Sequence, residues 1–251
     1  MKFILVGILG YLIGSISFAR IVMSIFSSDK SIQDIQLQVP GTQANFRSNA
    51  VSASMVNSLI GPRYGCLTSL LDMVKLGLPT LVLRFYFPDS VDYLIFAACC
   101  TLGHIWPLYY GFQGGRGMST ILIAFAIVDW QGVLVTFSIS LAVGLIRKDF
   151  YIGNKLSILL MIPWLWFRTQ SWTLVLFAVA MNLMNIIAVI PEIKEINRLR
   201  KEGNLKQFLQ AETIQVSQDE RAELDYRNTF YGEYQNIVRN IRHWLEKRFS
   251  K

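Results

Sequence analysis

The 251-residue chain has few of the residues that soluble enzymes use for catalysis. It contains 3 cysteines and 2 histidines, and the cysteines lack the spacing of a zinc site. The motifs HExxH and G-x-S-x-G and the lysine-containing phosphate-binding loop are also missing. The sequence therefore gives no support to triad hydrolysis or to protein-bound zinc, and we expect neither a metal nor a cofactor.

Charge is also scarce, and it is unevenly distributed. Charged residues make up 16% of the chain and hydrophobic residues 53%. From Glu192 onward the sequence holds 12 basic and 10 acidic residues, so the first 191 positions hold only 12 and 7. The long apolar runs of this first part are typical of a polytopic membrane protein. We predict a membrane domain at 1–191 and a charged cytoplasmic tail at 192–251.

The apolar segments predict an all-α fold, a membrane helix bundle of about seven spans. The segments lie at about 3–26, 64–87, 93–112, 117–128, 132–146, 155–168 and 172–190. The first could be a secretory signal peptide, but apolar sequence continues beyond Arg20 and favours a transmembrane helix. Segments 117–128 and 132–146 are short for separate perpendicular crossings, which predicts a hairpin of short helices around Asp129–Gly132.

Basic residues indicate which loops face the cytoplasm. They gather near 27–62, 113–116 and 147–155 and in the tail, whereas the turn at 88–92 is acidic. This distribution predicts an external N-terminus and agrees with an odd number of crossings. The stretch 27–62 is too polar to span, and its later part, Ala50–Ile60, could form a helix on the cytoplasmic surface.

The tail is predicted to contain two helices, the first at Ile193–Leu209 and interrupted by Gly203. Apolar residues recur near helical spacing in the second, and basic residues are frequent at its end. This mixture fits a helix attracted to anionic membrane lipid. It fits equally well a helix that docks on the protein's own loops or on a protein partner. Nothing in the sequence points to nucleic acid.

The stretch GHIWPLYYGFQGGRGMST (Gly103–Thr120) joins two apolar segments through a cationic glycine loop. Gly114, Gly115 and Gly117 allow the backbone to approach a ligand closely. Unpaired N–H groups at the start of the next helix favour an anion, and Arg116 adds a donor fork suited to phosphate. The loop is therefore suited to phosphate, although a tight turn with a cytoplasmic arginine would use the same residues.

Three further features stand out in the apolar part of the chain. His104 lies inside a span, where ionisable groups are often functional, although a buried structural histidine is the alternative. Asp72 and Lys75 are three residues apart on one helical face, where they can neutralise each other. Gly10 and Gly14 are four apart, which lets another helix approach closely.

Taken in order, these stretches resemble the bacterial integral-membrane glycerol-3-phosphate acyltransferases of the PlsY type, which use acyl phosphate. GYLIGSISF resembles the motif GYLxGSIPF, LLDMVK resembles LLDxLKG, and GHIWPLYYGFQGGRGMST resembles GHxxPVFLxFKGGKGVAT. NLMNI (Asn182–Ile186) is a weaker match to the late motif HRxNI. The similarity covers about residues 1–190, and the implied fold has seven spans and an external N-terminus.

The chain departs from the family pattern at the phosphate-binding loop GSGNxGATN. Aligned without a gap, this motif falls on Arg47–Met55, which keeps Ser48 and Ser54 but loses the glycines and asparagines. A register on Gly41–Asn49 keeps other matches but needs an insertion before LLD. The histidine of HRxNI is Asn182 here.

The resemblance implies acyl transfer from acyl phosphate to glycerol 3-phosphate, giving 1-acylglycerol 3-phosphate for phospholipid synthesis. It implies a multi-pass protein of the plasma (inner) membrane, in contact with membrane lipids, with its site facing the cytoplasm. Without a protein general base, positioning and charge stabilisation would carry the catalysis. The implied catalytic residues are His104, Arg116 and Asn185, and the implied substrate-binding residues are Gly114, Gly115, Gly117, Ser48, Ser54 and Lys75.

A second hypothesis is a non-catalytic or substrate-altered paralogue. Such a protein would retain a phosphate or lipid pocket and bind a partner through its tail. A transporter or scaffold has less support, because the sequence shows neither a pair of broken spans nor a chain of buried carboxylates.

Overall fold

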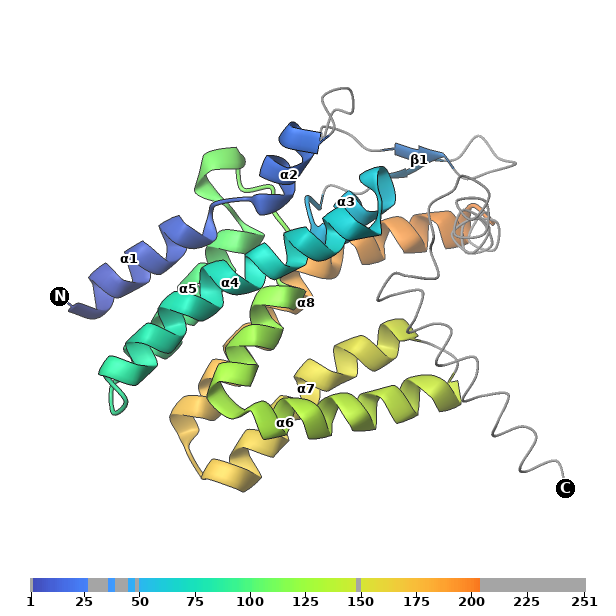
Figure 1. Ribbon diagram of the computed structural model, residues 1–251. Helices are drawn as coiled ribbons and strands as arrows, with labels where there is room; N and C mark the ends of the chain where they lie inside the picture. Colours follow the sequence, from blue (N-terminus) through green and yellow to red (C-terminus); the bar gives the residue numbers. More distant parts are fainter. Residues whose placement is uncertain (1, 27–35, 39–44, 48–49, 148–149, 204–251) are drawn as a thin grey trace, which may run out of the picture.

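The computed structural model describes residues 2–26, 36–38, 45–47, 50–147 and 150–203 (Figure 1). The regular secondary structure of these residues is helical apart from one short ribbon. The helices are α1 (Lys2–Gly14), α2 (Phe18–Phe26), α3 (Ala53–Ile60), α4 (Pro62–Tyr86), α5 (Asp92–Ile105), α6 (Met118–Arg147), α7 (Phe150–Thr169) and α8 (Trp172–Lys201), with a 3₁₀ turn η1 (Leu108–Tyr110). Strands β1 (Gln36–Gln38) and β2 (Asn45–Arg47) pair antiparallel. The predicted all-α class is confirmed except for this ribbon.

Four stretches are long and apolar enough to cross a membrane among the described residues. They are Phe3–Phe26, Pro62–Tyr86, Met118–Gly144 and Trp172–Lys201. Large apolar side chains such as Leu78 and Phe85 remain exposed on them, as expected where lipid rather than water covers a helix. Helices α5 and α7 lie on two further predicted spans.

The main apolar core joins six helices. It holds Val6, Leu76, Leu94, Phe96, Ala97, Cys100, Ile121, Ala124, Phe125, Ile158, Met161, Leu165, Phe177, Ala178 and Met181. The rings of Phe125 on α6 and Phe177 on α8 meet edge to face at 6.1 Å. A smaller cluster of Ala19, Val22, Met23, Val51 and Val56 fixes α2 against α3. The two clusters hold the parts of the chain that surround the glycine loop.

Glycines allow α1 and α5 to pack with their backbones almost in contact. A Cβ atom at Gly14 would lie 2.1 Å from the carbonyl oxygen of Cys100, and one at Gly103 would lie 2.2 Å from that of Tyr11. Such distances admit only hydrogen. The close approach predicted from Gly10 and Gly14 is confirmed, and the partner is α5.

The predicted span at 3–26 is interrupted. Helix α1 ends at Gly14 and α2 begins at Phe18, so carbonyl groups between them lack their partners in a continuous helix. The side chain of Lys75 donates hydrogen bonds to two of these carbonyl groups, those of Gly14 and Ile16. The helix expected within Ala50–Ile60 is confirmed as α3, and the Ser52 hydroxyl caps it by accepting a hydrogen bond from the Met55 N–H at 3.4 Å.

The break expected at Asp129–Gly132 is a kink within α6, where Asp129 adopts φ −154° and ψ 93°. Asp129 stabilises the bend, because its carboxylate accepts from the Gly132 N–H at 3.1 Å and from Trp164 Nε1 at 3.0 Å. It also pairs with Arg168 at 2.7 Å. The two short helices predicted on either side of this point are joined directly at the kink, because this side-chain network lets the chain turn within a few residues. The two arms point in different directions, and the second lies beside α7 (Figure 1).

Helix α8 continues through the predicted boundary between residues 191 and 192 and ends at Lys201. Gly203 follows with φ +75°, a conformation that favours glycine. The helix therefore ends just before Gly203, where the sequence predicts a break. The remaining predictions for the tail lie outside the described residues.

Candidate functional site

The glycine loop folds back onto the end of α5. The Gly115 N–H donates to the His104 carbonyl at 3.1 Å, and a Cβ atom at Gly114 would lie 2.2 Å from the same oxygen. Gly117 adopts φ +78°, and its carbonyl then accepts from the Ile121 N–H at 2.8 Å to begin α6. Close contact within the protein therefore accounts for Gly114 and Gly115, and the backbone conformation accounts for Gly117.

Two elements hold the loop from its other side. The Val51 N–H, just before α3, donates to the Gly114 carbonyl at 3.0 Å. Arg20 on α2 donates to the Gln113 carbonyl at 3.2 Å, and its guanidinium lies 4.8 Å from the centre of the Tyr110 ring. The segment that resembles the family's phosphate-binding loop therefore adjoins the glycine loop, at least at Val51.

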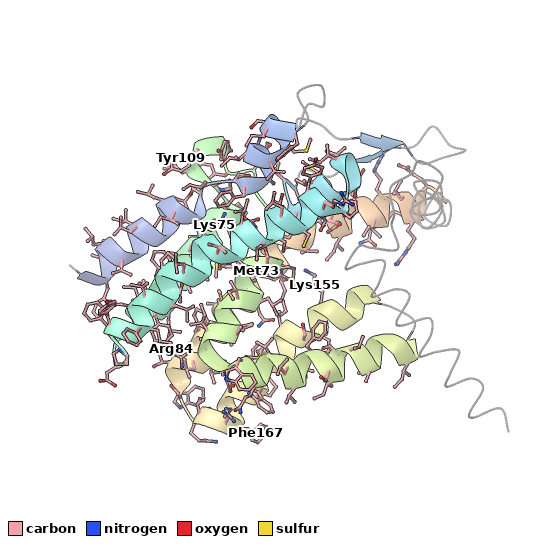
Figure 2. All side chains as sticks on the ribbon, viewed as in Figure 1. Met73, Lys75, Arg84, Tyr109, Lys155 and Phe167 are labelled. Atoms are coloured by element: carbon pink, nitrogen blue, oxygen red, sulfur yellow. The ribbon has the colours of Figure 1, made fainter. Side chains whose placement is uncertain are left out.

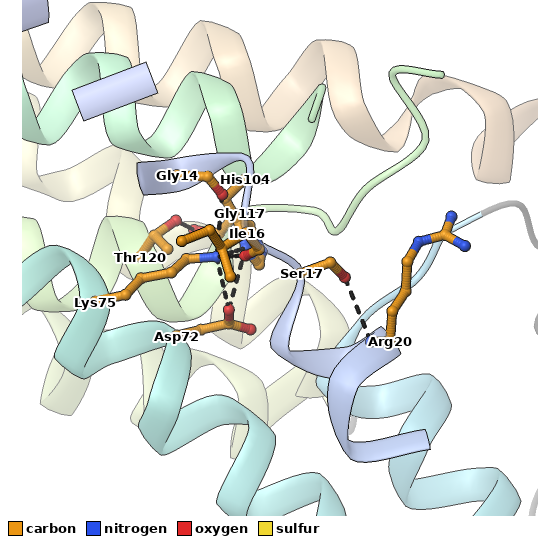
Figure 3. Close-up of polar contacts among 9 residues, drawn as sticks. All are labelled: Gly14, Ile16, Ser17, Arg20, Asp72, Lys75, His104, Gly117 and Thr120. Atoms are coloured by element: carbon orange, nitrogen blue, oxygen red, sulfur yellow. Dashed lines mark hydrogen bonds and ion pairs between the residues drawn. The ribbon is translucent and has the colours of Figure 1, made fainter. Parts of the chain in front are cut away.

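A buried ionic cluster lies behind the loop (Figure 3). Lys75 Nζ lies 2.9 Å from Asp72 Oδ1, with the two side chains only 4% and 2% exposed. The same ammonium group donates to the carbonyls of Gly14 at 3.1 Å and Ile16 at 2.6 Å. It also lies 3.2 Å from His104 Nδ1. The predicted Asp72–Lys75 pair is confirmed, and it additionally fixes the break between α1 and α2.

His104 lies against both members of the ion pair. The ammonium group of Lys75 donates to the carbonyls of Gly14 and Ile16 and lies within 3.2 Å of Asp72 Oδ1 and His104 Nδ1. His104 Nδ1 also lies 3.4 Å from Asp72 Oδ1. This arrangement directs the other ring nitrogen, Nε2, toward Gly115, where an added Cβ atom would lie 2.5 Å from it. The imidazole ring thus forms the support on which the glycine loop lies.

A second polar network surrounds Arg116. Asn185 Nδ2 on α8 donates to the Arg116 carbonyl at 2.8 Å, and Lys155 Nζ donates to Asn185 Oδ1 at 2.9 Å. Lys155 extends from α7 toward α8 (Figure 2). The guanidinium of Arg116 pairs with Glu192 at 2.9 Å, with the two side chains 23% and 16% exposed. Two basic side chains therefore lie near one partly open position.

The structure brings most of the sequence-predicted residues into these two networks. Ser48 lies outside the described residues. Ser54 is exposed on α3, one turn beyond the Val51 contact. Asn182, where the late motif has histidine, donates to the carbonyls of Ile158 and Ala178 at 2.9 Å each. Its amide nitrogen therefore joins α8 to α7.

Sequence reasoning missed Lys155, Glu192 and Arg20 as members of the site. The sequence places Lys155 at the end of a basic cytoplasmic loop, Arg20 inside the first apolar segment and Glu192 in the charged tail. One signal was available for Glu192, because residues seven apart lie on one helical face and Asn185 is seven positions earlier. Among the described residues, no group of three or more His, Cys, Asp or Glu could hold a metal ion.

Comparison with known proteins identifies the family of the chain. Residues 4–202 match the family model described as glycerol-3-phosphate acyltransferase. The chain belongs to the glycerol-3-phosphate acyltransferase family. The family resemblance inferred from the motifs is thereby confirmed.

Relatives and solved structures of this family cover most of the chain. The glycerol-3-phosphate acyltransferase of Pelagibacter ubique is 29% identical, over 73% of this chain and 88% of that protein. The enzyme of Finegoldia magna is 32% identical, over 60% and 81% respectively.

The crystal structure of PlsY (YgiH), an integral membrane glycerol 3-phosphate acyltransferase, in its lysophosphatidic acid form superposes with a TM-score of 0.64. It covers 80% of this chain and 93% of its own, at 23% identity. The glycerol 3-phosphate form gives a TM-score of 0.63. These likenesses establish a shared membrane-protein fold.

Proposed function

We propose that this chain transfers an acyl group from acyl phosphate to glycerol 3-phosphate, giving 1-acylglycerol 3-phosphate and phosphate. Family membership supports glycerol 3-phosphate as the acceptor. The observation that carries the proposal is the position of Arg116. Its backbone is fixed by Asn185, while its guanidinium stays partly exposed beside a second cation, Lys155. Such a pair of cations suits a phosphate group.

The proposed reaction needs no protein group to carry the proton. A hydroxyl oxygen of glycerol 3-phosphate attacks the acyl carbonyl carbon, and the bond from that carbon to the phosphate oxygen breaks. Phosphate leaves with the electron pair and takes up the hydroxyl proton. The protein then contributes by holding both substrates and by stabilising negative charge on the phosphate groups.

In this proposal Arg116 and the backbone at Gly114–Gly117 bind phosphate, and Asn185 sets the position of Arg116 through its carbonyl. Lys75 acts by position, because its ammonium hydrogens are used by protein acceptors. The His104 ring packs against Gly115 and so supports the glycine loop. Ser48 and Ser54 remain proposed substrate ligands on the strength of the family motif.

The protein is proposed to lie in the plasma (inner) membrane. It would cross this membrane seven times, with an external N-terminus and a site that faces the cytoplasm. The two arms of α6 count as two crossings, because Asp129 changes the direction of the helix between them. The membrane domain ends near residue 191, and the charged tail follows on the cytoplasmic side. The partner of the tail is proposed to be anionic lipid or another protein.

One observation favours the alternative, a non-catalytic paralogue. The position of the late-motif histidine is taken by Asn182, whose amide nitrogen is used for packing. The deciding experiment supplies purified protein with acyl phosphate and labelled glycerol 3-phosphate and measures labelled lysophosphatidic acid. Product formation that requires acyl phosphate is expected. Binding of glycerol 3-phosphate without product would identify the paralogue.

A further inference from the structure

One face of α8 contacts both the backbone and the side chain of Arg116. Asn185 donates to the Arg116 carbonyl at 2.8 Å, and Glu192 pairs with the Arg116 guanidinium at 2.9 Å. Asn185 and Glu192 are two helical turns apart, so a single rigid element carries both contacts. Glu192 therefore occupies a fixed place relative to the glycine loop.

Glu192 pairs with the Arg116 guanidinium, the group that would bind the phosphate of the substrate. Carboxylate and phosphate oxygens both accept from the planar N–H fork of an arginine, so the two anions compete for it. Lys155 interacts electrostatically with both Arg116 and Glu192. A phosphate monoester carries close to two negative charges at neutral pH, so it attracts these two cations more strongly than a carboxylate of single charge does.

We propose that Glu192 is a built-in counter-anion that the phosphate of glycerol 3-phosphate replaces on Arg116. This inference rests on the proposed function, because it assigns Arg116 to the phosphate of that substrate. Before the substrate binds, the carboxylate keeps the partly buried guanidinium paired. The incoming anion gains only the difference between its own contacts and those of Glu192. A doubly charged phosphate therefore replaces Glu192 more readily than a singly charged carboxylate does.

The inference predicts that removing the charge of Glu192 tightens substrate binding. Glu192→Gln keeps the shape of the side chain and removes the competing charge. We expect it to lower the Kd for glycerol 3-phosphate and for inorganic phosphate by about two- to fivefold, the range for a partly exposed ion pair. The KM for glycerol 3-phosphate should fall by a similar factor, while kcat changes little. Both constants are measured on the full chain in detergent, binding by calorimetry without an acyl donor.

Glu195→Gln is the matched control. Glu195 lies on the same helix and pairs with Arg198 at 2.6 Å. Its substitution removes the same charge from α8 without changing the Arg116 pair, so the Kd should stay within about twofold. Glu192→Asp retains the charge and should bind more weakly than Glu192→Gln. In an Arg116→Ala background, Glu192→Gln should lose its tightening effect, because the competed group is gone.

The outcomes separate this inference from the proposed function. Weaker or unchanged binding in Glu192→Gln, with a melting temperature like that of the parent protein, would overturn it and make Glu192 a residue that merely positions Arg116. Tighter binding without acyl transfer would uphold the inference and overturn the proposed reaction. No binding of glycerol 3-phosphate by the parent protein would overturn the inference as well.

Discussion

At the scale of single residues, the cluster of Asp72, Lys75 and His104 shows how a membrane protein can keep charges inside. Asp72 and Lys75 pair with each other, and the ammonium group also donates to two carbonyl oxygens. A buried pair of this kind contributes little net stability when intact, but breaking it leaves one charge without compensation. The cluster is therefore sensitive to single substitutions and tolerant of paired ones.

Lys75→Met should destabilise the protein by about 3–5 kcal/mol, because Asp72 would remain buried and ionised beside bare carbonyl groups. Thermal unfolding in detergent measures the effect. Asp72→Asn combined with Lys75→Met should unfold at a higher temperature than Lys75→Met alone, since no buried charge then remains. Equal melting temperatures for Lys75→Met and the parent protein would show that the ion pair does not stabilise the fold.

Arg116→Ala should lower kcat/KM for glycerol 3-phosphate by roughly 10- to 150-fold. A charge-assisted hydrogen bond contributes about 1.5–3 kcal/mol, and each 1.4 kcal/mol changes the constant about tenfold. Arg116→Lys should recover much of the activity, because lysine stands at this place in the resembling motif. Arg198→Ala serves as the control, since Arg198 pairs with Glu195 and Glu202 of its own helix. Normal kinetics in Arg116→Ala would show that the glycine loop is a turn and does not bind the substrate.

Gly115→Ala should reduce acyl transfer although it changes no charge. The added Cβ atom would lie 2.5 Å from His104 Nε2, so the loop or the imidazole must move. Gly111→Ala is the comparison, because no atom lies within 4 Å of its Cβ position and only the backbone conformation, φ +60°, is strained. That strain costs about 1–2 kcal/mol. Initial rates of the two variants, normalised to folded protein, provide the measurement; equal rates would contradict the proposed support by His104.

At the scale of elements, the contact between α1 and α5 decides where His104 lies. The glycines at this contact let the two backbones touch, and the end of α5 then reaches the glycine loop. A side chain inserted into this contact would separate the helices and shift His104 with them.

Gly103→Ala should therefore lower both stability and activity. Its Cβ atom would lie 2.2 Å from the Tyr11 carbonyl oxygen, and overpacking of this kind typically costs about 1–3 kcal/mol. Gly7→Ala meets the Cys99 sulfur at 3.3 Å, a side-chain atom that can move, and should have a smaller effect. Melting temperatures in detergent compare the two variants. A larger drop for Gly7→Ala would show that backbone contact is not what limits the packing.

The elements also show what the sequence could and could not indicate. The glycine pattern on α1 and the Asp72–Lys75 spacing were readable, because both depend on helical periodicity alone. The break after Gly14 was not readable, since it depends on Lys75 reaching carbonyl groups 59 and 61 residues away. The kink at Asp129 depends on Trp164 and Arg168 of another helix.

The candidate site follows the same division. The glycine loop and Arg116 were predicted because their suitability for phosphate depends on residues that are adjacent in the sequence. Glu192 and Lys155 were missed because their roles come from α7 and α8 meeting the loop. Composition placed Glu192 with the soluble tail, whereas α8 runs continuously through that boundary.

At the scale of the whole molecule, the proposed topology makes a definite prediction about three positions. A reporter inserted at Ser90 or at Gln131 should be external, and one fused after Glu202 should be cytoplasmic. Gln131 follows the kink at Asp129, so its location tells whether the arms of α6 cross separately. A cytoplasmic Gln131 would contradict the seven-span arrangement, and Ser90 on the same side as Glu202 would contradict the proposed orientation.

The two carbonyl groups that receive Lys75 also bear on how the chain is built during translation. Gly14 and Ile16 leave the ribosome before α4 does, whereas His104 and the glycine loop follow later. An ammonium group entering lipid without acceptors is strongly disfavoured. The interrupted end of the first helix therefore offers acceptors that are already present when the charged helix is inserted. Insertion of α4 need not wait for the rest of the site to be synthesised.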